Sequence, residues 1–299
     1  MQFLKIAPDA RSTGMAETFS AVTNDVSALY WNPAGITRID SQQFHFQAGF
    51  TRYYAATNLQ YGGAVYRVAA DKYLGLHLIF LSSGNMDVTT EFMPFGTGQT
   101  YQASDLAIGL TYAQNLTQNF GFGLTTKYIR ESIFDVNTST VVFDFGFQYE
   151  VGKANTRFAV GISNFGFNAE PKGEVSVTTL TGTTNVSDFE GISIPAIFRL
   201  GVAWDAVKKE SHLFTLAAQL NHPTDNNETY SLGSEYGWKN TVFLRTGYLF
   251  GVDEKGAPSF GFGVNYKRSF GMVKLDYGFA NKWRLGMTHR ITLGLSLFK

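Results

Sequence analysis

The stretch Val141-Val142-Phe143-Asp144-Phe145-Gly146-Phe147-Gln148-Tyr149 sets the pattern for most of the chain. Its large apolar side chains recur at every second position, and smaller or polar residues stand between them. Successive side chains of a β-strand point to opposite faces, so this period predicts a strand with one apolar face. The other face lacks the Lys and Glu expected on a water-exposed sheet and suits a crowded lumen better.

The same period recurs from about residue 42 to the end of the chain. We predict about fourteen strands, an even number as in bacterial outer-membrane barrels. Short turns alternate with longer connections, notably 83–101 and 166–191, which predicts periplasmic turns and extracellular loops. The predicted strands cover residues 42–52, 57–68, 72–83, 102–114, 120–131, 140–150, 156–165, 192–205, 211–221, 229–238, 240–249, 258–268, 270–280 and 288–298.

The composition favours a lipid-facing wall over a soluble β protein. Charged residues make up 16% of the 299 residues, below the usual quarter, while Phe, Tyr and Gly number 27, 15 and 31. The net charge of zero gives no basic patch for nucleic acid. The absence of cysteine excludes disulfides, thiolate metal sites and Cys nucleophiles. The sequence therefore predicts an all-β, transmembrane antiparallel β-barrel.

The start of the chain bears on its location. No run of about 18 apolar residues predicts a transmembrane helix, and residues 1–8 lack the apolar core of a signal peptide. An outer-membrane barrel must be exported. We therefore expect the numbered chain to be a mature form in the bacterial outer membrane, with its signal peptide already removed.

Residues 1–41 do not follow the strand pattern. Apolar residues between 15 and 22 recur at helical spacing, and Ser12 or Thr13 is the expected N-cap. Pro33 should end helical structure, because the residue before proline is pushed out of the α region. We expect this segment to fold as an N-terminal helical hatch in the lumen.

The remainder, residues 42–299, should form the barrel. A barrel of this size has a wider lumen than one of eight strands, so a plug can fit inside. Charges of both signs should face the lumen, and we interpret them as ion pairs that hold the hatch rather than a selectivity ring of one sign. These residues are Lys127, Asp144, Glu150, Arg199, Asp205, Glu235, Arg245, Lys267, Lys274 and Asp276.

Two N-terminal segments, residues 3–15 and 25–35, resemble the PorV/PorQ family of Bacteroidota outer-membrane proteins, as does the C-terminal segment 287–295. The resemblance centres on a hatch motif of Trp31, Asn32, Pro33, Ala34 and Gly35. That family is related to the FadL long-chain fatty-acid transporters, which carry a similar Asn-Pro-Ala in the hatch. The resemblance implies a FadL-like, 14-stranded barrel. It also implies an association with the type IX secretion system, in which PorV carries secreted cargo.

The sequence gives little support for catalysis. The five histidines, at 45, 77, 212, 222 and 289, lack the spacing of metal ligands. No nucleophile elbow, P-loop or dinucleotide fingerprint occurs. We expect no enzymatic activity, no catalytic residue, no cofactor and no metal.

One long outer loop carries the residues Phe92, Met93, Pro94 and Phe95. Apolar side chains outside the membrane suggest a contact surface for a partner, although a loop folded over the barrel mouth would explain them equally well. Segment 166–191 allows the same two readings, and a short β-hairpin is plausible there.

The leading hypothesis is a barrel that binds protein partners, of the PorV/PorQ type, in a membrane of outer-membrane lipid. Its partner would be a secretion translocon subunit or the signal domain of a cargo protein. The alternative is a FadL-type transporter of hydrophobic small molecules, and a passive structural barrel is a third possibility. A transporter needs an apolar pocket and a kinked strand; Pro195 and Gly62–Gly63 are the candidate breakers. The inward-facing side chains of the predicted strands are small and polar, which weakly disfavours a tunnel for an acyl chain and hence the transporter.

Overall fold

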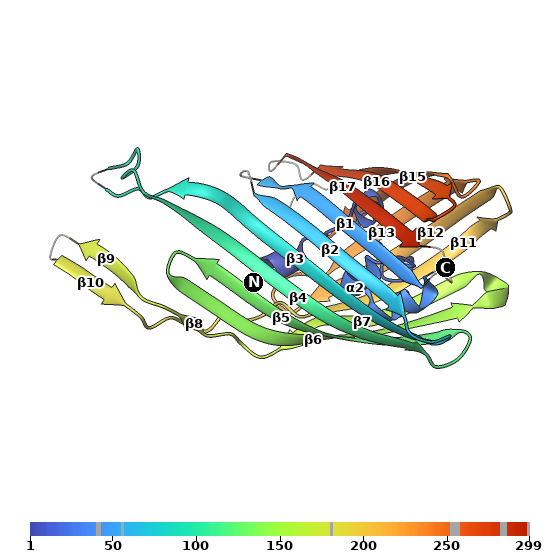
Figure 1. Ribbon diagram of the computed structural model, residues 1–299, viewed down its shortest axis with the longest axis horizontal. Helices are drawn as coiled ribbons and strands as arrows, with labels where there is room; N and C mark the ends of the chain where they lie inside the picture. Colours follow the sequence, from blue (N-terminus) through green and yellow to red (C-terminus); the bar gives the residue numbers. More distant parts are fainter. Residues whose placement is uncertain are drawn as a thin grey trace.

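The computed structural model describes the chain except for residues 40–42, 55–56, 92, 180–181, 252–257, 282–285 and 298–299. Fourteen antiparallel strands form a closed barrel, as predicted (Figure 1). Its first half consists of β1 (Phe44–Arg52), β2 (Asn58–Arg67), β3 (Lys72–Asp87), β4 (Thr100–Asn115), β5 (Phe120–Ile133), β6 (Val136–Val151) and β7 (Thr156–Gly166). Its second half consists of β11 (Ile197–Lys208), β12 (His212–Pro223), β13 (Thr229–Trp238), β14 (Val242–Phe250), β15 (Ser259–Arg268), β16 (Gly271–Asn281) and β17 (Met287–Leu297).

The barrel closes between its first and last strands. β1 pairs with β17 from Phe44 opposite Leu297 to Arg52 opposite His289. Each strand otherwise pairs with its neighbours in sequence, except that the segment between β7 and β11 adds the short strands β8 (Pro171–Lys172), β9 (Val175–Thr179) and β10 (Gly182–Val186). Closure leaves no open edge along the wall, as a lipid-embedded sheet requires.

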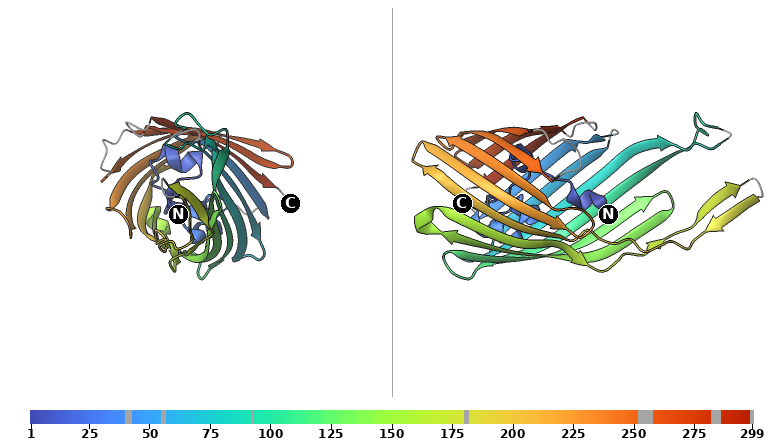
Figure 2. Two further views of the ribbon diagram at one scale, coloured as in Figure 1. Left: turned by 90° about the vertical axis from the view of Figure 1, so that its left-hand side faces the viewer. Right: turned by 180° about the vertical axis from the view of Figure 1, so that it is seen from behind.

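The two ends of the barrel differ. One end carries short turns, the start of β1 and the end of β17, and the other carries the long connections β3–β4 and β7–β11. The long-connection end, called the mouth below, is the extracellular end of barrels of this kind. Strands β3 to β6 extend toward it beyond their neighbours, and the β9–β10 hairpin projects furthest (Figures 1 and 2). The hairpin expected in segment 166–191 is therefore present.

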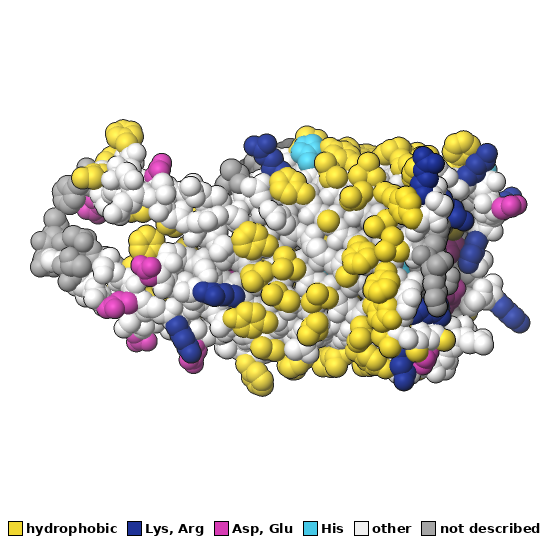
Figure 3. Space-filling model, viewed as in Figure 1, with side chains coloured by type: hydrophobic (Ala, Val, Ile, Leu, Met, Phe, Trp, Pro, Cys, Tyr) yellow, Lys and Arg dark blue, Asp and Glu magenta, His cyan; other side chains and the backbone are white. Residues whose placement is uncertain are grey.

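The outer wall carries an apolar band (Figure 3). Large side chains such as Leu76, Leu110 and Leu244 are exposed on it. Trp204 and Trp238 are also exposed, at the strand ends where membrane interfaces favour aromatic rings. Among the described residues no helix is long and apolar enough to cross a membrane.

The N-terminal segment, residues 1–39, lies inside the barrel (Figure 2). It contains the 3-10 helix η1 (Gln2–Lys5), α1 (Ala10–Gly14), α2 (Ala28–Trp31) and the 3-10 helix η2 (Pro33–Arg38). The helical prediction was too long and its N-cap was wrong. The side chain of Asp9, not Ser12 or Thr13, accepts the capping hydrogen bond, from the Ser12 N–H. The helix ends early because Ala16 and Glu17 take positive φ angles of 50° and 65°.

Candidate functional site

The hatch motif is the centre of the hydrogen bonding within the N-terminal segment. The Trp31 indole N–H donates to the carboxylate of Asp9 at 2.8 Å, and the Tyr30 hydroxyl donates to the carbonyl of Leu4 at 2.9 Å. Asp9 also caps α1, so one buried carboxylate joins α1 to α2. The motif thereby holds the start of the chain against its own helices.

Asn32 links the segment to the wall. Its backbone is extended, with φ −161°, and its side-chain oxygen accepts from the Ala34 N–H at 3.1 Å, capping η2. Its amide nitrogen donates to the carbonyl of Phe147 in β6 at 3.1 Å and to that of Ser20 at 3.3 Å. Pro33 occupies the first position of η2, where proline fits because no N–H is needed.

Replacing Asn32 with alanine should loosen this attachment. The change removes a helix cap and leaves two buried carbonyls without their donor, a loss of about 1–3 kcal/mol. We expect Asn32→Ala to lower the midpoint of urea unfolding in lipid vesicles and to increase protease cleavage at Arg11 and Arg38. Asn227→Ala is the control, since Asn227 is exposed in the connection between β12 and β13. Equal cleavage in the two variants would contradict the assignment.

Inward-facing glycines let the wall approach the N-terminal segment closely. A Cβ atom on Gly123 of β5 would lie 2.7 Å from the Pro33 carbonyl oxygen, and one on Gly247 of β14 would lie 2.6 Å from the Met15 carbonyl oxygen. These contacts come from opposite sides of the barrel. The small inward-facing residues predicted from the sequence therefore make room for the N-terminal segment inside the barrel.

Ion pairs attach the segment to the wall. Arg11 makes two hydrogen bonds of 2.8 Å to the carboxylate of Glu235 in β13, and it also pairs with Asp25 at 2.7 Å. Arg38 pairs with Glu150 of β6 at 2.9 Å. Glu235 and Glu150 therefore hold the segment as predicted.

Other predicted lumen charges pair within the wall instead. Arg245 joins Glu235 to Asp276, with both distances 2.6 Å. Lys127 pairs with Asp144 at 2.8 Å. A third wall pair is formed by Asp205 of β11 and Arg157 of β7, at 2.7 Å. Lys267 has the same strand parity as the inward-facing Gly261 and Gly263 of β15 and is exposed near the short-turn end.

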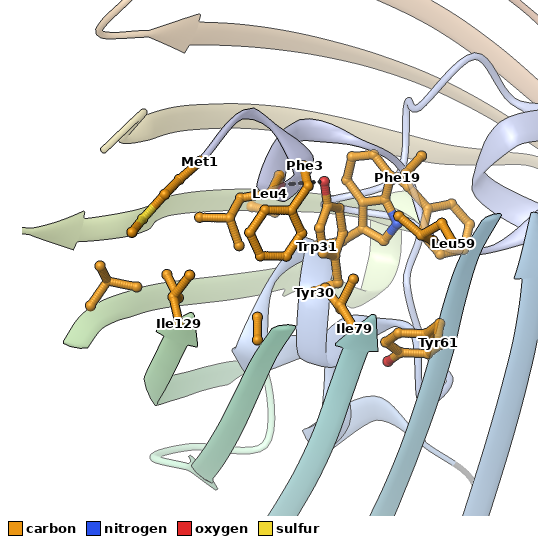
Figure 4. Packing of buried hydrophobic residues seen from close by; sticks show 14 of the residues in the cluster. Met1, Phe3, Leu4, Phe19, Tyr30, Trp31, Leu59, Tyr61, Ile79 and Ile129 are labelled. Carbon is orange, nitrogen blue, oxygen red and sulfur yellow. Dashed lines mark hydrogen bonds between the residues drawn. The ribbon is translucent and has the colours of Figure 1, made fainter. Parts of the chain in front are cut away.

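One part of the inner wall is apolar, contrary to the sequence reading. Leu59, Ile79 and Ile129 point inward from β2, β3 and β5, and each is at most 1% exposed. Phe3 and Leu4 of the N-terminal segment cover this patch (Figure 4). The period-two pattern shows that faces alternate, but it does not show which apolar positions turn inward.

The segment between β7 and β11 contributes to the same core from the mouth. Ala169 is 2% exposed and Ile194 is 6% exposed, and both belong to the cluster that includes Phe3 and Ile79. The base of this segment therefore folds into the mouth, while its β9–β10 hairpin projects outward (Figure 1). The base of segment 166–191 therefore fits the reading of a loop folded over the mouth, while a contact surface on its exposed part stays a prediction.

A cavity of about 390 Å³ lies between the N-terminal segment and strands β11 to β14. Its lining includes Lys5, Tyr30, Trp31, Tyr53 and Arg199. The guanidinium of Arg199 is 4% exposed and lies over the rings of Tyr30 and Trp31, at 5.6 and 5.3 Å. Among the described residues its hydrogen-bond acceptor is the Ser163 hydroxyl, at 2.6 Å, and no carboxylate pairs with it. Sequence reasoning placed Arg199 in the lumen but missed this cavity.

Lys5 closes one side of the cavity. It pairs with Asp225 of the β12–β13 connection at 2.9 Å, and Gln2 donates to the same carboxylate at 2.8 Å. Partial burial works to raise the pKa of Asp225, but the hydrogen bonds from Gln2 and Lys5 lower it overall. The contact therefore contributes stability above the ordinary carboxylate pKa and loses it as the pH falls through the lowered value.

The strand breakers named from the sequence do not produce kinks. Gly62 and Gly63 lie within β2, whose pairing with β1 and β3 is continuous there. Pro195 precedes β11 and lies outside the strands. Register shifts occur elsewhere, between Ser82 and Asn85 in β3, between Asp205 and Val207 in β11, and at a bulge in β7 opposite Asp144, where Asn164 has a φ of 61°.

The outer loop expected to contact a partner is exposed. Met93 is 54% exposed and Phe95 is fully exposed, while Phe92 lies outside the described residues. Pro94 is exposed between them. These side chains do not fold over the mouth. The described residues also contain no group of three or more His, Asp or Glu side chains placed to hold a metal ion.

The closed antiparallel wall, its apolar outer band and its internal plug define an outer-membrane β-barrel protein. The sequence matches no protein-family model and no curated protein. The fold is similar to that of the Pseudomonas putida toluene transporter TodX, with a TM-score of 0.67, 13% identity and coverage of 98% of both chains. It is also similar to the Ralstonia pickettii toluene transporter TbuX, with a TM-score of 0.64, 12% identity and coverage of 98% of both chains.

A Pseudomonas aeruginosa FadL homologue is similar as well, with a TM-score of 0.59, 12% identity and coverage of 97% of this chain and 98% of that one. The architecture is therefore that of the FadL-type barrels. At these identities the likeness extends to the fold alone. Membership of the PorV/PorQ family stays a prediction.

Proposed function

We propose that this protein is a FadL-type passage for hydrophobic small molecules across the outer membrane. The observation that carries the proposal is the apolar inner wall formed by Leu59, Ile79 and Ile129, placed below the mouth. Phe3 and Leu4 of the N-terminal segment cover this patch, so a solute would reach it only after these side chains move aside. Two proteins of similar fold are described as toluene transporters, which supports this class of solute.

In this proposal residues 1–41 act as a hatch domain and the motif Trp31 to Gly35 fixes it. The hatch blocks a straight path because opposite walls hold it through Gly123 and Gly247. A solute entering at the mouth would meet the cavity beside Arg199 and then the apolar wall. No catalytic step is involved.

The test is uptake of toluene and of a long-chain fatty acid into liposomes that contain the purified barrel. Ile129→Gln places an amide on the apolar patch, and an unpaired buried amide costs about 1–3 kcal/mol. We therefore expect uptake to slow roughly tenfold or more. Val186→Gln, on the exposed hairpin, is the matched control. Uptake no faster than in empty liposomes, or equal in both variants, would contradict the proposal.

The variant Arg199→Gln tests whether the fatty acid or toluene is the preferred solute. A buried guanidinium without a carboxylate partner favours a solute that carries its own anionic group. Fatty-acid uptake should fall in this variant if the acid is the preferred solute, while toluene uptake should stay unchanged. Equal effects on both solutes would assign Arg199 to holding the hatch.

Protein binding is the second candidate, and the exposure of Met93 and Phe95 favours it. A secretion translocon subunit or a cargo signal domain, as in PorV/PorQ-type proteins, would dock at these loops. Replacing residues 91–96 with a Gly/Ser linker should abolish co-purification of the partner, while heat-sensitive gel migration shows that the barrel still folds. Unchanged co-purification would remove the loop from this role.

A further inference from the structure

We propose that residues 167–179 and 182–196 form a movable lid, which closes the mouth in this structure and swings aside to admit a solute to the apolar inner wall. The proposal rests in part on the proposed transport function. It concerns a different feature, because transport requires the apolar wall, whereas the lid determines access to it.

The lid closes the mouth with a few apolar side chains. Ala169 and Ile194 are buried in the core with Phe3 and Ile79. Ile192 is half-buried and packs against the same cluster. The rest of the lid is largely exposed, including Phe167 at 85%. Opening the lid therefore uncovers a small apolar area on the lid and the part of the cluster of Phe3 and Ile79 against which it packs.

The attachment of the lid to the barrel is sparse. Its two arms are joined to each other by hydrogen bonds between Ala169 and Ile192, at 2.9 and 2.8 Å. In the described part of the chain, its strand pairing with the wall is limited to β8, where Lys172 lies opposite Asn137 and Pro171 opposite Thr138. The β9–β10 hairpin forms a separate two-stranded sheet. Two joined arms with little wall pairing can move as one unit.

Both ends of the lid are held at one point, which suits a hinge. The amide of Asn164 in β7 donates to the carbonyl of Pro195 at 3.3 Å, and the Asn164 N–H donates to the carboxylate of Asp144 at 2.7 Å. Lys127 contacts both Asn164 and Asp144. β7 pairs with β11 as far as Ser163 and with β6 as far as Gly166, so the lid begins just beyond the bulge at Asn164.

A disulfide lock tests whether transport needs the movement. Asn137 and Lys172 are directly paired, so cysteines there fall within disulfide range, and the chain has no other cysteine. We expect oxidised Asn137→Cys/Lys172→Cys to take up toluene at least tenfold more slowly than the reduced form. Ser176→Cys/Asn185→Cys staples the hairpin alone and is the matched control, expected to be unaffected. Wild-type uptake by the locked barrel would overturn the lid's role in transport.

A labelling experiment tests the movement without relying on transport. Ile194 lies on the inner side of the closed lid and is buried, whereas Thr184 on the hairpin is exposed. Each is replaced with cysteine in a separate variant. With a membrane-impermeant maleimide, Ile194→Cys should label at least tenfold more slowly than Thr184→Cys, yet to completion in the folded barrel. Labelling only after heat unfolding would overturn the lid. If liposomes that contain the wild-type barrel show no uptake, the transport proposal fails. The labelling result then decides by itself whether the lid moves.

Discussion

Gly123→Val is expected to expel the N-terminal segment from the barrel. A side chain at this position collides with the backbone of Pro33 and Ala34, which cannot turn aside as a flexible side chain would. Overpacking of this kind typically costs about 1–3 kcal/mol, and a backbone clash lies at the upper end. The barrel should still form, because its strand pairing does not depend on this position.

Limited proteolysis and conductance measure the effect. We expect trypsin to cut at Lys5 and Arg11 in the variant while the wall resists, and the opened lumen should conduct ions in a planar bilayer. Gly62→Val is the control, because a Cβ there meets nothing within 4 Å. If the N-terminal segment of Gly123→Val stays protected, the room that Gly123 leaves is not what holds it.

Glu235→Ala is expected to destabilise the protein by about 3–5 kcal/mol, the usual cost of removing one partner from a buried ion pair. Glu235 is 2% exposed and receives hydrogen bonds from both Arg11 and Arg245. Its removal leaves two guanidinium groups in the lumen, of which Arg11 keeps Asp25 and Arg245 keeps Asp276. The N-terminal segment should loosen first, since Arg11 loses its contact with the wall.

Urea unfolding in lipid vesicles measures the loss of stability, and protease cleavage at Arg11 reports the loosening. Glu228→Ala is the control, because Glu228 forms an exposed pair with His222 and such pairs contribute little. A midpoint unchanged from wild type in Glu235→Ala would show that the two arginines find other partners.

Local chemistry explains why the barrel itself was predictable. The alternation in Val141–Tyr149 is a property of consecutive residues, and each strand showed it independently of its neighbours. Most predicted strands agree with the observed ones because the period of two and the turn residues suffice to place them. The exceptions are β11, which begins at Ile197 rather than at residue 192, and β3 and β6, which extend toward the mouth beyond their predicted ends. The helix ended early because positive φ angles at Ala16 and Glu17 follow from packing in the lumen, which no local pattern records.

The site was less predictable because it joins residues far apart in the chain. The motif Trp31 to Gly35 was visible as a sequence. Glu150 and Glu235, which pair with Arg38 and Arg11, were correctly placed in the lumen. The pairing of Arg11 with Glu235, over more than 200 positions, follows from barrel closure. The cavity beside Arg199 arises from the N-terminal segment and four strands together.

By itself, the sequence determined the strands, their even number, the outer-membrane barrel and the presence of a non-strand N-terminal segment, because all of these follow from periodicity and composition. Only the tertiary structure decided which apolar residues face the lumen, how inward-facing glycines make room for the N-terminal segment and where Ala169 and Ile194 join the core. The physical reason is that these features depend on distances across the lumen. Such distances exist only once the last strand pairs with the first.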